Sequence, residues 1–202
     1  MKTIVTNMET TAVFTDDGTK RYLLRKTWEI EKPKLAVIML APSEASGIEL
    51  DSTTLLVLNN SSRLGYGSVD ILNLFATLND FSLKQAEDED VENLDYVIKS
   101  AKDVDDIIYC AGVGKAKNKA FIKRQTQILS ALLPYEAKLK CLTNAAGTAR
   151  LQHPLSPAVR TWKLSALKIA ELIPEIITTP EKGQEKGKIR AGKQNSKKDS
   201  LL

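Results

Sequence analysis

The sequence has little of what metal or disulfide chemistry requires. Its 202 residues include one histidine and two cysteines, which excludes a site with two histidine ligands, and no Cys or His spacing suits zinc. Cys110 and Cys141 lie within apolar, strand-like runs, where thiols are shielded from reagents. We therefore expect two structural thiols, no metal, no cofactor and a reducing, cytoplasmic compartment.

Long hydrophobic runs are also absent. The most continuous one, Leu35–Ala41, is far shorter than the roughly 20 residues that cross a bilayer. The first residues, Met1–Asn7, lack the apolar core of a secretory signal. We expect no membrane partner.

The excess of basic over acidic side chains comes entirely from the end of the chain. The formal net charge is +4, and residues 181–202 carry all of it, with seven basic and three acidic side chains. This segment has no apolar periodicity, so it cannot bury enough surface to offset its ordering entropy. We interpret residues 181–202 as a disordered basic tail, and the rest of the chain is not a strongly basic body.

A hairpin and four buried strands are predicted ahead of that tail. Thr11–Thr15 and Arg21–Lys26 are extended and flank the turn residues Asp16–Gly18, which predicts a β-hairpin within residues 1–30. Four short apolar runs follow at intervals long enough to hold a helix each, as parallel strands require. These runs are Leu35–Leu40, Val69–Leu74, Asp106–Cys110 and Lys138–Leu142.

Apolar residues recur with helical spacing between and after these runs. The predicted helices cover Ser52–Leu64, Val91–Ala101, Phe121–Leu132 and a last segment that places Val159, Trp162, Ala166, Ile169 and Ile173 on one stripe. The alternation predicts an α/β fold. We expect residues 31–180 to form a three-layer α/β/α sandwich with a four-stranded parallel sheet, preceded by the hairpin extension.

Polar or conformationally special residues follow all four predicted strands. They are Pro42 and Ser43, Asn73, Gly112–Lys115, and Asn144 with His153–Pro157 shortly after it. Ligands bind at the carboxyl ends of parallel strands, because loop amides and helix N-termini converge there. The same residue types also simply terminate strands. We predict a ligand site at this edge of the sheet.

The succession of motifs resembles a bacterial and phage family, domain of unknown function 1643, over about residues 20–165. The motifs are Arg21–Trp28, Leu40–Ala45, Asp51–Thr53, Gly65–Gly67, Asn73–Ala76 and His153–Leu155. Two departures are visible. Ala41 stands where the family usually has Asn, and Ala111 stands where it usually has Trp. Ala41 has no amide group, so it cannot take over a role that depends on that Asn.

A second, weaker resemblance is to the uracil-DNA glycosylase superfamily, whose core is a four-stranded parallel sheet between helices. Leu40–Gly47 is similar to a Gly-Leu-Ala-Pro form of its first catalytic motif, and His153–Pro157 is similar to its His-Pro-Ser-Pro-like loop. Asn73 stands where members use an Asn to read the base edge. The resemblance implies an enzyme that removes a base from DNA.

Base excision sets the roles that we assign. It needs a carboxylate near the sugar, an amide for the base edge and a donor for the charge on the leaving base. Asp51 or Glu44 is the candidate carboxylate, Asn73 the amide and His153 the donor. The candidates for stacking on the base are Tyr66 and Phe75.

The remaining candidates bind the base or the nucleic acid. Gly112, Gly114 and Lys115 form a glycine turn that suits a phosphate, although the spacing is not that of a nucleotide-hydrolysing loop. Pro42, Ser43, Asn144 and Ser156 complete the set.

Each candidate also has a purely structural interpretation. Asp51 is placed to cap a helix, His153 to act as a loop donor and Asn73 to close a strand. The glycine turn is equally typical of a βα connection.

The expected function is therefore that of a DNA-glycosylase-like protein that binds or excises a modified base in DNA. The alternative is a non-catalytic nucleotide or nucleic-acid binding module of a phage or mobile element. A protein-interaction scaffold would instead present a large exposed apolar patch.

Overall fold

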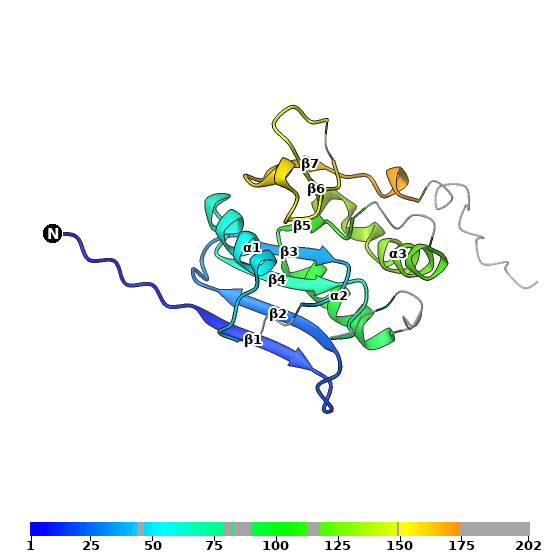
Figure 1. Cartoon of the computed structure of the whole chain (residues 1–202), viewed down its shortest axis with the longest axis horizontal. Helices are drawn as coiled ribbons and strands as arrows, with labels where there is room; N and C mark the ends of the chain where they lie inside the picture. Colours follow the sequence, from blue (N-terminus) through cyan, green and yellow to red (C-terminus); the bar gives the residue numbers. More distant parts are fainter. Residues whose placement is uncertain (44–46, 79–81, 83–89, 113–117, 149, 174–202) are drawn as a thin grey trace, which may run out of the picture.

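The described part of the protein forms one mixed sheet of seven strands in the order β1-β2-β4-β3-β5-β6-β7 (Figure 1). The computed structural model describes residues 1–43, 47–78, 82, 90–112, 118–148 and 150–173. The strands are β1 Glu9–Phe14, β2 Arg21–Thr27, β3 Lys34–Met39, β4 Ser68–Asn73, β5 Asp106–Tyr109, β6 Leu139–Thr143 and β7 Lys163–Ala166. β3 pairs in parallel with β4 and β5, and β5 pairs in parallel with β6. The fold is thus α/β, as predicted.

The sheet is larger than the four-stranded sheet that we predicted, because antiparallel strands extend it at both sides. β2 pairs with β4, β1 pairs with β2, and β7 pairs with β6. The predicted hairpin is present, but it continues the main sheet instead of standing apart from it. Since β2 runs opposite to β4, the first residue of β2 lies at the carboxyl end of β4, where the Arg21 amide donates to the Ala76 carbonyl.

Three helices are each preceded by an N-cap residue, whose side chain accepts a hydrogen bond from the backbone amide three positions later. They are α1 Ser52–Arg63, α2 Val91–Asp103 and α3 Lys119–Ala131. Their N-caps, Asp51, Asp90 and Asn118, accept from backbone amides at 2.6, 2.9 and 3.0 Å. These caps satisfy amides that would otherwise lack a partner at each helix start. The three predicted helices in these regions are confirmed.

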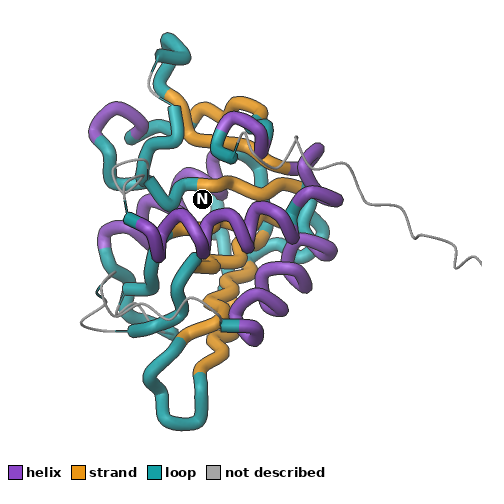
Figure 2. The backbone as a smooth tube through the Cα atoms, turned by 90° about the vertical axis from the view of Figure 1, so that its right-hand side faces the viewer, coloured by secondary structure: helices purple, strands orange, loops and turns teal. Residues whose placement is uncertain are grey.

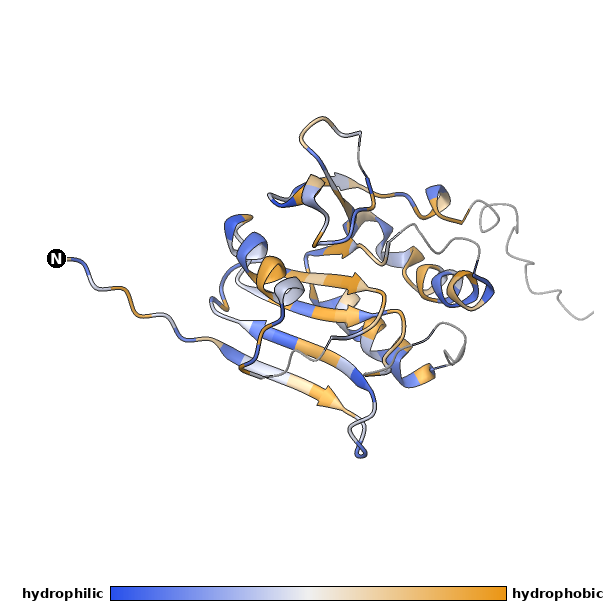
Figure 3. Ribbon diagram, in the orientation of Figure 1, coloured by the Kyte–Doolittle hydropathy of each residue, from blue (hydrophilic) through white to orange (hydrophobic). Residues whose placement is uncertain are grey.

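The helices cover both faces of the sheet (Figure 2). Along β3, Leu35, Val37 and Met39 pack in a core with Val57 of α1. The alternate residues Ala36 and Ile38 pack in a second core, which α2 and α3 complete. Strand side chains alternate between faces, so β3 must be apolar throughout to serve both cores. Figure 3 shows the resulting hydrophobic band along β3 and β4.

The prediction of a last helix with Val159, Trp162, Ala166, Ile169 and Ile173 on one stripe is wrong. The segment forms the short 3₁₀ turns η2 Pro157–Val159 and η3 Ile169–Glu171 on either side of β7. Val159 and Trp162 pack in the core that contains α1, whereas Ile169 and Ile173 pack in the opposite core. The apolar stripe is therefore divided between two faces of the sheet, and no single helix could serve both.

The structure also bears on the predicted absence of membrane-spanning segments and on the two cysteines. Within the described ranges, no helix is both long and apolar enough to cross a membrane. Cys110 and Cys141 are buried and unbridged, as predicted. The predicted tail, residues 181–202, lies outside the described residues.

Candidate functional site

The carboxyl ends of β3 and β4 form the edge at which we predicted a ligand site. Met39 and Asn73 end the two strands side by side, and both arrows point the same way in Figure 1. Arg21, at the start of β2, reaches this edge and donates from Nη1 to the Ser43 carbonyl oxygen at 3.2 Å. Its side chain is buried. The edge therefore contains a buried guanidinium held against the loop that follows β3.

Asp51 lies in this cluster and is held as a carboxylate. Burial alone raises the pKa of its carboxyl, but hydrogen bonds from Ser43 and Thr54 and the nearby Arg21 guanidinium outweigh burial. The net effect is a pKa below the ordinary value of 3.8. Asp51 thus caps α1 and also presents a negative charge at the carboxyl edge.

His153 comes from the loop after β6 and lies within electrostatic reach of Asp51. Burial lowers the pKa of its imidazole, and the Asp51 charge partly offsets this by raising it. Nδ1 of His153 accepts a hydrogen bond from the Leu155 backbone amide at 3.2 Å. A neutral imidazole that accepts at Nδ1 carries its proton on Nε2. The ring is therefore a neutral donor through Nε2.

Asn73 contributes a buried amide at the end of β4. Strand alternation puts its side chain on the α1 face with Val69 and Ile71. Its Nδ2 has no hydrogen-bond partner in the described part of the chain. A buried amide donor without a partner is costly in a folded protein, so such a group marks a place where a ligand atom would be stabilised.

The backbone that carries Asn73 is held from the opposite face. Asn93 of α2 donates from Nδ2 to the carbonyl oxygens of Asn73 and Leu74 at 3.0 and 3.1 Å. Arg124 of α3, which is fully buried, donates from Nε to the Leu74 carbonyl at 2.7 Å. The backbone at Asn73 and Leu74 is thereby held by both helices of that face.

Comparison with known families agrees with the resemblance found in the sequence. A family model described as "Protein of unknown function (DUF1643)" matches residues 21–155. The chain belongs to this family. No curated protein and no solved structure matches it. The resemblance to uracil-DNA glycosylases stays a prediction.

The DUF1643 region contains the cluster of Arg21, Ser43, Asp51 and His153, and also Asn73 at the end of β4. It begins at Arg21, which sequence reasoning did not select as a site residue. The cluster therefore joins the first and the last motifs of the DUF1643 region in space, although 130 or so residues separate them in the chain.

The other predicted binding residues lie in the loops around this DUF1643 cluster. Pro42 precedes Ser43, and Gly112 follows β5 with a φ of +88°, a left-handed conformation that suits glycine. Asn144 and Ser156 bond within their own loops, Asn144 to Thr148 and Ser156 to Gln152, each at 2.9 Å. These last two stabilise loop structure.

The two predicted stacking residues do not join the cluster. Tyr66 precedes β4 and donates from its hydroxyl to Asp106 at the first residue of β5, at 2.5 Å. It therefore lies at the amino edge of the sheet, opposite the cluster. Phe75 is buried in the core shared with α2 and α3. Neither ring is placed to stack on a ligand beside Asp51.

Three predicted residues, Glu44, Gly114 and Lys115, lie outside the described residues. Among the residues that are described, no group of three or more His, Cys, Asp or Glu side chains is arranged to hold a metal ion.

A second basic side chain of β2 also holds the loop after β3. Lys26 is fully buried and donates from Nζ to the Thr10 hydroxyl at 3.0 Å and to the Gly47 carbonyl oxygen. Burial lowers the pKa of its ammonium group. Sequence reasoning missed Lys26 and Arg21 because it treated the hairpin as an extension. The signal was the family motif Arg21–Trp28, which covers the whole of β2.

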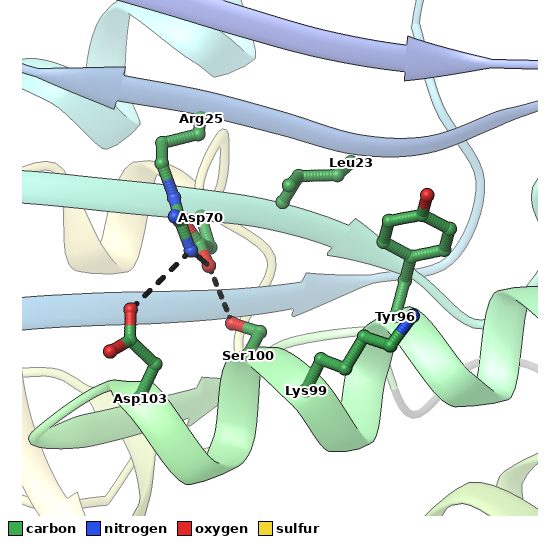
Figure 4. A pocket seen from close by; sticks show the side chains of 7 residues that line it. All are labelled: Leu23, Arg25, Asp70, Tyr96, Lys99, Ser100 and Asp103. Carbon is green, nitrogen blue, oxygen red and sulfur yellow. Dashed lines mark hydrogen bonds and ion pairs between the residues drawn. The ribbon is translucent and has the colours of Figure 1, made fainter.

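A hollow of about 300 Å³ lies elsewhere, on the α2 side of the sheet (Figure 4). It is lined by Leu23, Arg25, Asp70, Tyr96, Lys99, Ser100 and Asp103. Arg25 donates to both carboxylate oxygens of Asp70 at 2.6 Å, and the Ser100 hydroxyl donates to Asp70 at 2.7 Å. These groups satisfy one another and tie α2 to β2 and β4. The hollow is thus a structural junction.

Proposed function

We propose that this DUF1643 protein recognises a base in DNA at the carboxyl edge of its sheet and excises it, as a DNA glycosylase does. One observation carries the proposal. An ionised Asp51 and a neutral His153, contributed by loops after different strands, lie within electrostatic reach of each other. An anionic carboxylate together with a neutral imidazole that still carries a proton on Nε2 supplies one group for a developing positive charge and one donor for a developing negative charge.

The chemistry assigns a separate role to each group. The bond from the sugar C1′ to the base nitrogen breaks, the base leaves with the electron pair, and a water oxygen bonds to C1′ while its proton goes to solvent or to the base. The Asp51 carboxylate would stabilise the positive charge that develops on the sugar. The Nε2–H of His153 would donate to the negative charge on the leaving base. Both charges develop only in the transition state, so these interactions favour rate over binding.

Asn73 would read the base. Its unpartnered Nδ2 is a donor, and a flipped base presents carbonyl and ring-nitrogen acceptors on its Watson-Crick edge. The fixed backbone around Asn73 supports this role, because a group that discriminates between bases must be rigid.

The arrangement of elements supports a fold of the uracil-DNA glycosylase type, which we include in the proposal. The parallel pairs β4-β3, β3-β5 and β5-β6 form a continuous four-stranded core within the sheet. α1 packs in one core, and α2 and α3 pack in the other. A three-layer α/β/α sandwich of this type would bring the first-motif and last-motif loops to one edge.

A second candidate function is binding of a nucleotide or nucleic acid without turnover. Ala41 supports it, because this residue removes a polar side chain from the centre of the proposed site. Arg21 also supports it, since a buried guanidinium beside Asp51 partly neutralises the carboxylate. Such a module would hold a base without the charge separation that excision needs.

Base release from oligonucleotides tests the proposal. The full chain is incubated with single- and double-stranded DNA that contains uracil, hypoxanthine, hydroxymethyluracil or other modified bases, and abasic sites are detected by alkaline strand cleavage. His153→Asn keeps an acceptor for the Leu155 amide but lacks the Nε2 donor, and we expect a loss of about 100-fold in rate. Asp51→Asn keeps the helix cap and removes the charge, with a loss of similar size.

Asp90→Asn is the control, because Asp90 caps α2, a helix of the opposite core, and the substitution likewise keeps a cap acceptor while removing a charge, here one that pairs with Lys20. It should retain full base release. The proposal fails if no base is released from the panel, or if His153→Asn and Asp51→Asn release base at the wild-type rate. Binding of abasic DNA without any release would instead support the second candidate.

A further inference from the structure

Asn60 of α1 is a buried polar residue that the proposed chemistry does not use. Its side chain makes four hydrogen bonds, two of them within its own helix: Nδ2 donates to the Leu56 carbonyl, and Oδ1 accepts from Arg63. The other two reach the segment after β6, where Nδ2 donates to the Arg160 carbonyl and Oδ1 accepts from the Trp162 amide, both at 3.2 Å. One side chain thus anchors a backbone segment 100 residues away.

The anchored segment leads directly back to His153. The Ser156 amide donates to the His153 carbonyl at 2.8 Å, and the Val159 amide donates to the Ser156 carbonyl at 3.0 Å. Val159 and Trp162 are buried in the core that α1 shares. Consecutive turns and a buried anchor at one end leave the backbone from His153 to Trp162 little freedom.

The same helix carries the other partner of His153. Asp51 is the N-cap of α1, and Asn60 lies nine residues further along that helix, about 13 Å at 1.5 Å per residue. The same rigid helix, α1, therefore contacts both the loop that contains His153 and the Asp51 carboxylate. It holds the loop through Asn60 near one end and presents the Asp51 carboxylate at the other.

We propose that Asn60 is a positioning residue that sets the His153 imidazole beside the Asp51 carboxylate. The inference rests on the proposed function for its catalytic meaning, but its geometry does not depend on turnover. Asn60 does not touch the reacting atoms. It fixes the separation of the two groups that do.

A purely stabilising role for Asn60 is the competing explanation, so the test needs a readout that stability alone does not move. His153 is the one histidine of the chain, which gives the full-length protein a single set of imidazole resonances in an NMR titration. In the wild-type background, Asp51→Asn should lower the pKa of His153, because the carboxylate raises it. That response measures how closely the two groups are held.

Asn60→Leu keeps the number and branching of the side-chain heavy atoms and removes all four hydrogen bonds. We expect the response of His153 to Asp51→Asn to be lost in this background, and the pKa of His153 to move up toward the ordinary histidine value as the ring becomes solvated. Val57→Ala is the control, because it removes buried volume from the same helix and core but leaves the four hydrogen bonds of Asn60 in place. It should keep the full response.

An undiminished response in Asn60→Leu would overturn the inference. If that variant fails to fold, Asn60→Asp replaces it, because its carboxylate is tolerated beside Arg63 but repels the Arg160 carbonyl oxygen; an undiminished response there overturns the inference equally. The titration is informative whether or not any base is released. A protein that releases no base but loses the response in Asn60→Leu would refute the proposed function and leave the positioning role intact.

Discussion

The guanidinium Nη1 of Arg21 lies 3.2 Å from the carbonyl oxygen of Ser43. This contact joins the first residue of β2 to the loop that follows β3, and the same guanidinium lowers the pKa of Asp51. Arg21 therefore holds the loop after β3 by a hydrogen bond and also stabilises the negative charge of Asp51.

Arg21→Met should raise the pKa of Asp51 and loosen the loop after β3, because the methionine fills the space without a charge or a donor. The expected result is faster amide hydrogen exchange in a peptide that spans residues 41–51, measured by mass spectrometry. Arg160→Met, at an exposed arginine, is the control and should leave that peptide unchanged. Equal exchange in both variants would show that Arg21 does not hold the loop.

Asp51 has a capping role that can be separated from its charge. Asp51→Ala should lower the free energy of unfolding by about 1 kcal/mol, because the Thr54 amide loses its acceptor, and Asp51→Asn should lower it by less. Asp90→Ala on α2 should cost about as much as Asp51→Ala. Urea denaturation at pH 7 measures all three.

The pH dependence of Asp51 follows from its lowered pKa. Its pKa is below 3.8 in the folded chain, so its ionised form stabilises the fold above about pH 4, and this contribution is lost as the pH falls through the folded value. The stability difference between the wild type and Asp51→Asn should therefore shrink in acid. A difference that stays constant down to pH 2 would contradict the assignment.

His153 should make the fold less stable as the pH falls below its ordinary pKa of 6.5. Its pKa is lowered in the folded chain, so the unfolded chain binds the proton more readily. Protonation of Nδ1 also removes the acceptor of the Leu155 amide. We expect the Leu155 amide and the His153 ring to titrate together by NMR, and His153→Asn to flatten the stability profile between pH 5 and 7 in urea denaturation.

Asp70→Ala should lower the free energy of unfolding by about 3 kcal/mol, near the low end for a broken buried ion pair, because its partner Arg25 is 36% exposed. Asp103→Ala should cost less than about 1 kcal/mol, since its ion pairs with Arg25 at 3.7 Å and with Lys34 at 3.1 Å are both exposed. Neither change should alter binding of abasic DNA. An effect of Asp70→Ala on DNA binding, in protein shown to be folded, would reassign the hollow of Figure 4 as a functional site.

The helices were predictable because their start signals are local. Asp51 precedes a run with helical spacing, and the predicted helix from Ser52 ends within one residue of the observed α1. The failure after residue 157 has the opposite cause. Spacing identifies apolar residues but not the face that each will cover, and Leu142 pairs with Leu164 only after the sheet has assembled.

The candidate site was predictable where it depends on one rule, that loops after parallel strands share an edge. Asp51 and His153 follow that rule. Tyr66 violates it because it precedes its strand. Phe75 follows the end of β4, where strand alternation no longer applies, and it packs in the other core together with Leu74. Arg21 was missed because its place at the edge depends on the antiparallel pairing of β2 with β4, a long-range contact that no local pattern reports.

The outermost strands, β1 and β7, both lie outside residues 21–155, the part that defines the family. A fragment trimmed to that part would leave the backbone donors and acceptors along β2 and β6 open to neighbouring molecules. Such a fragment would be prone to self-association and precipitation during purification. Expression of this region for crystallisation or spectroscopy is therefore best designed around the complete sheet, residues 9–173.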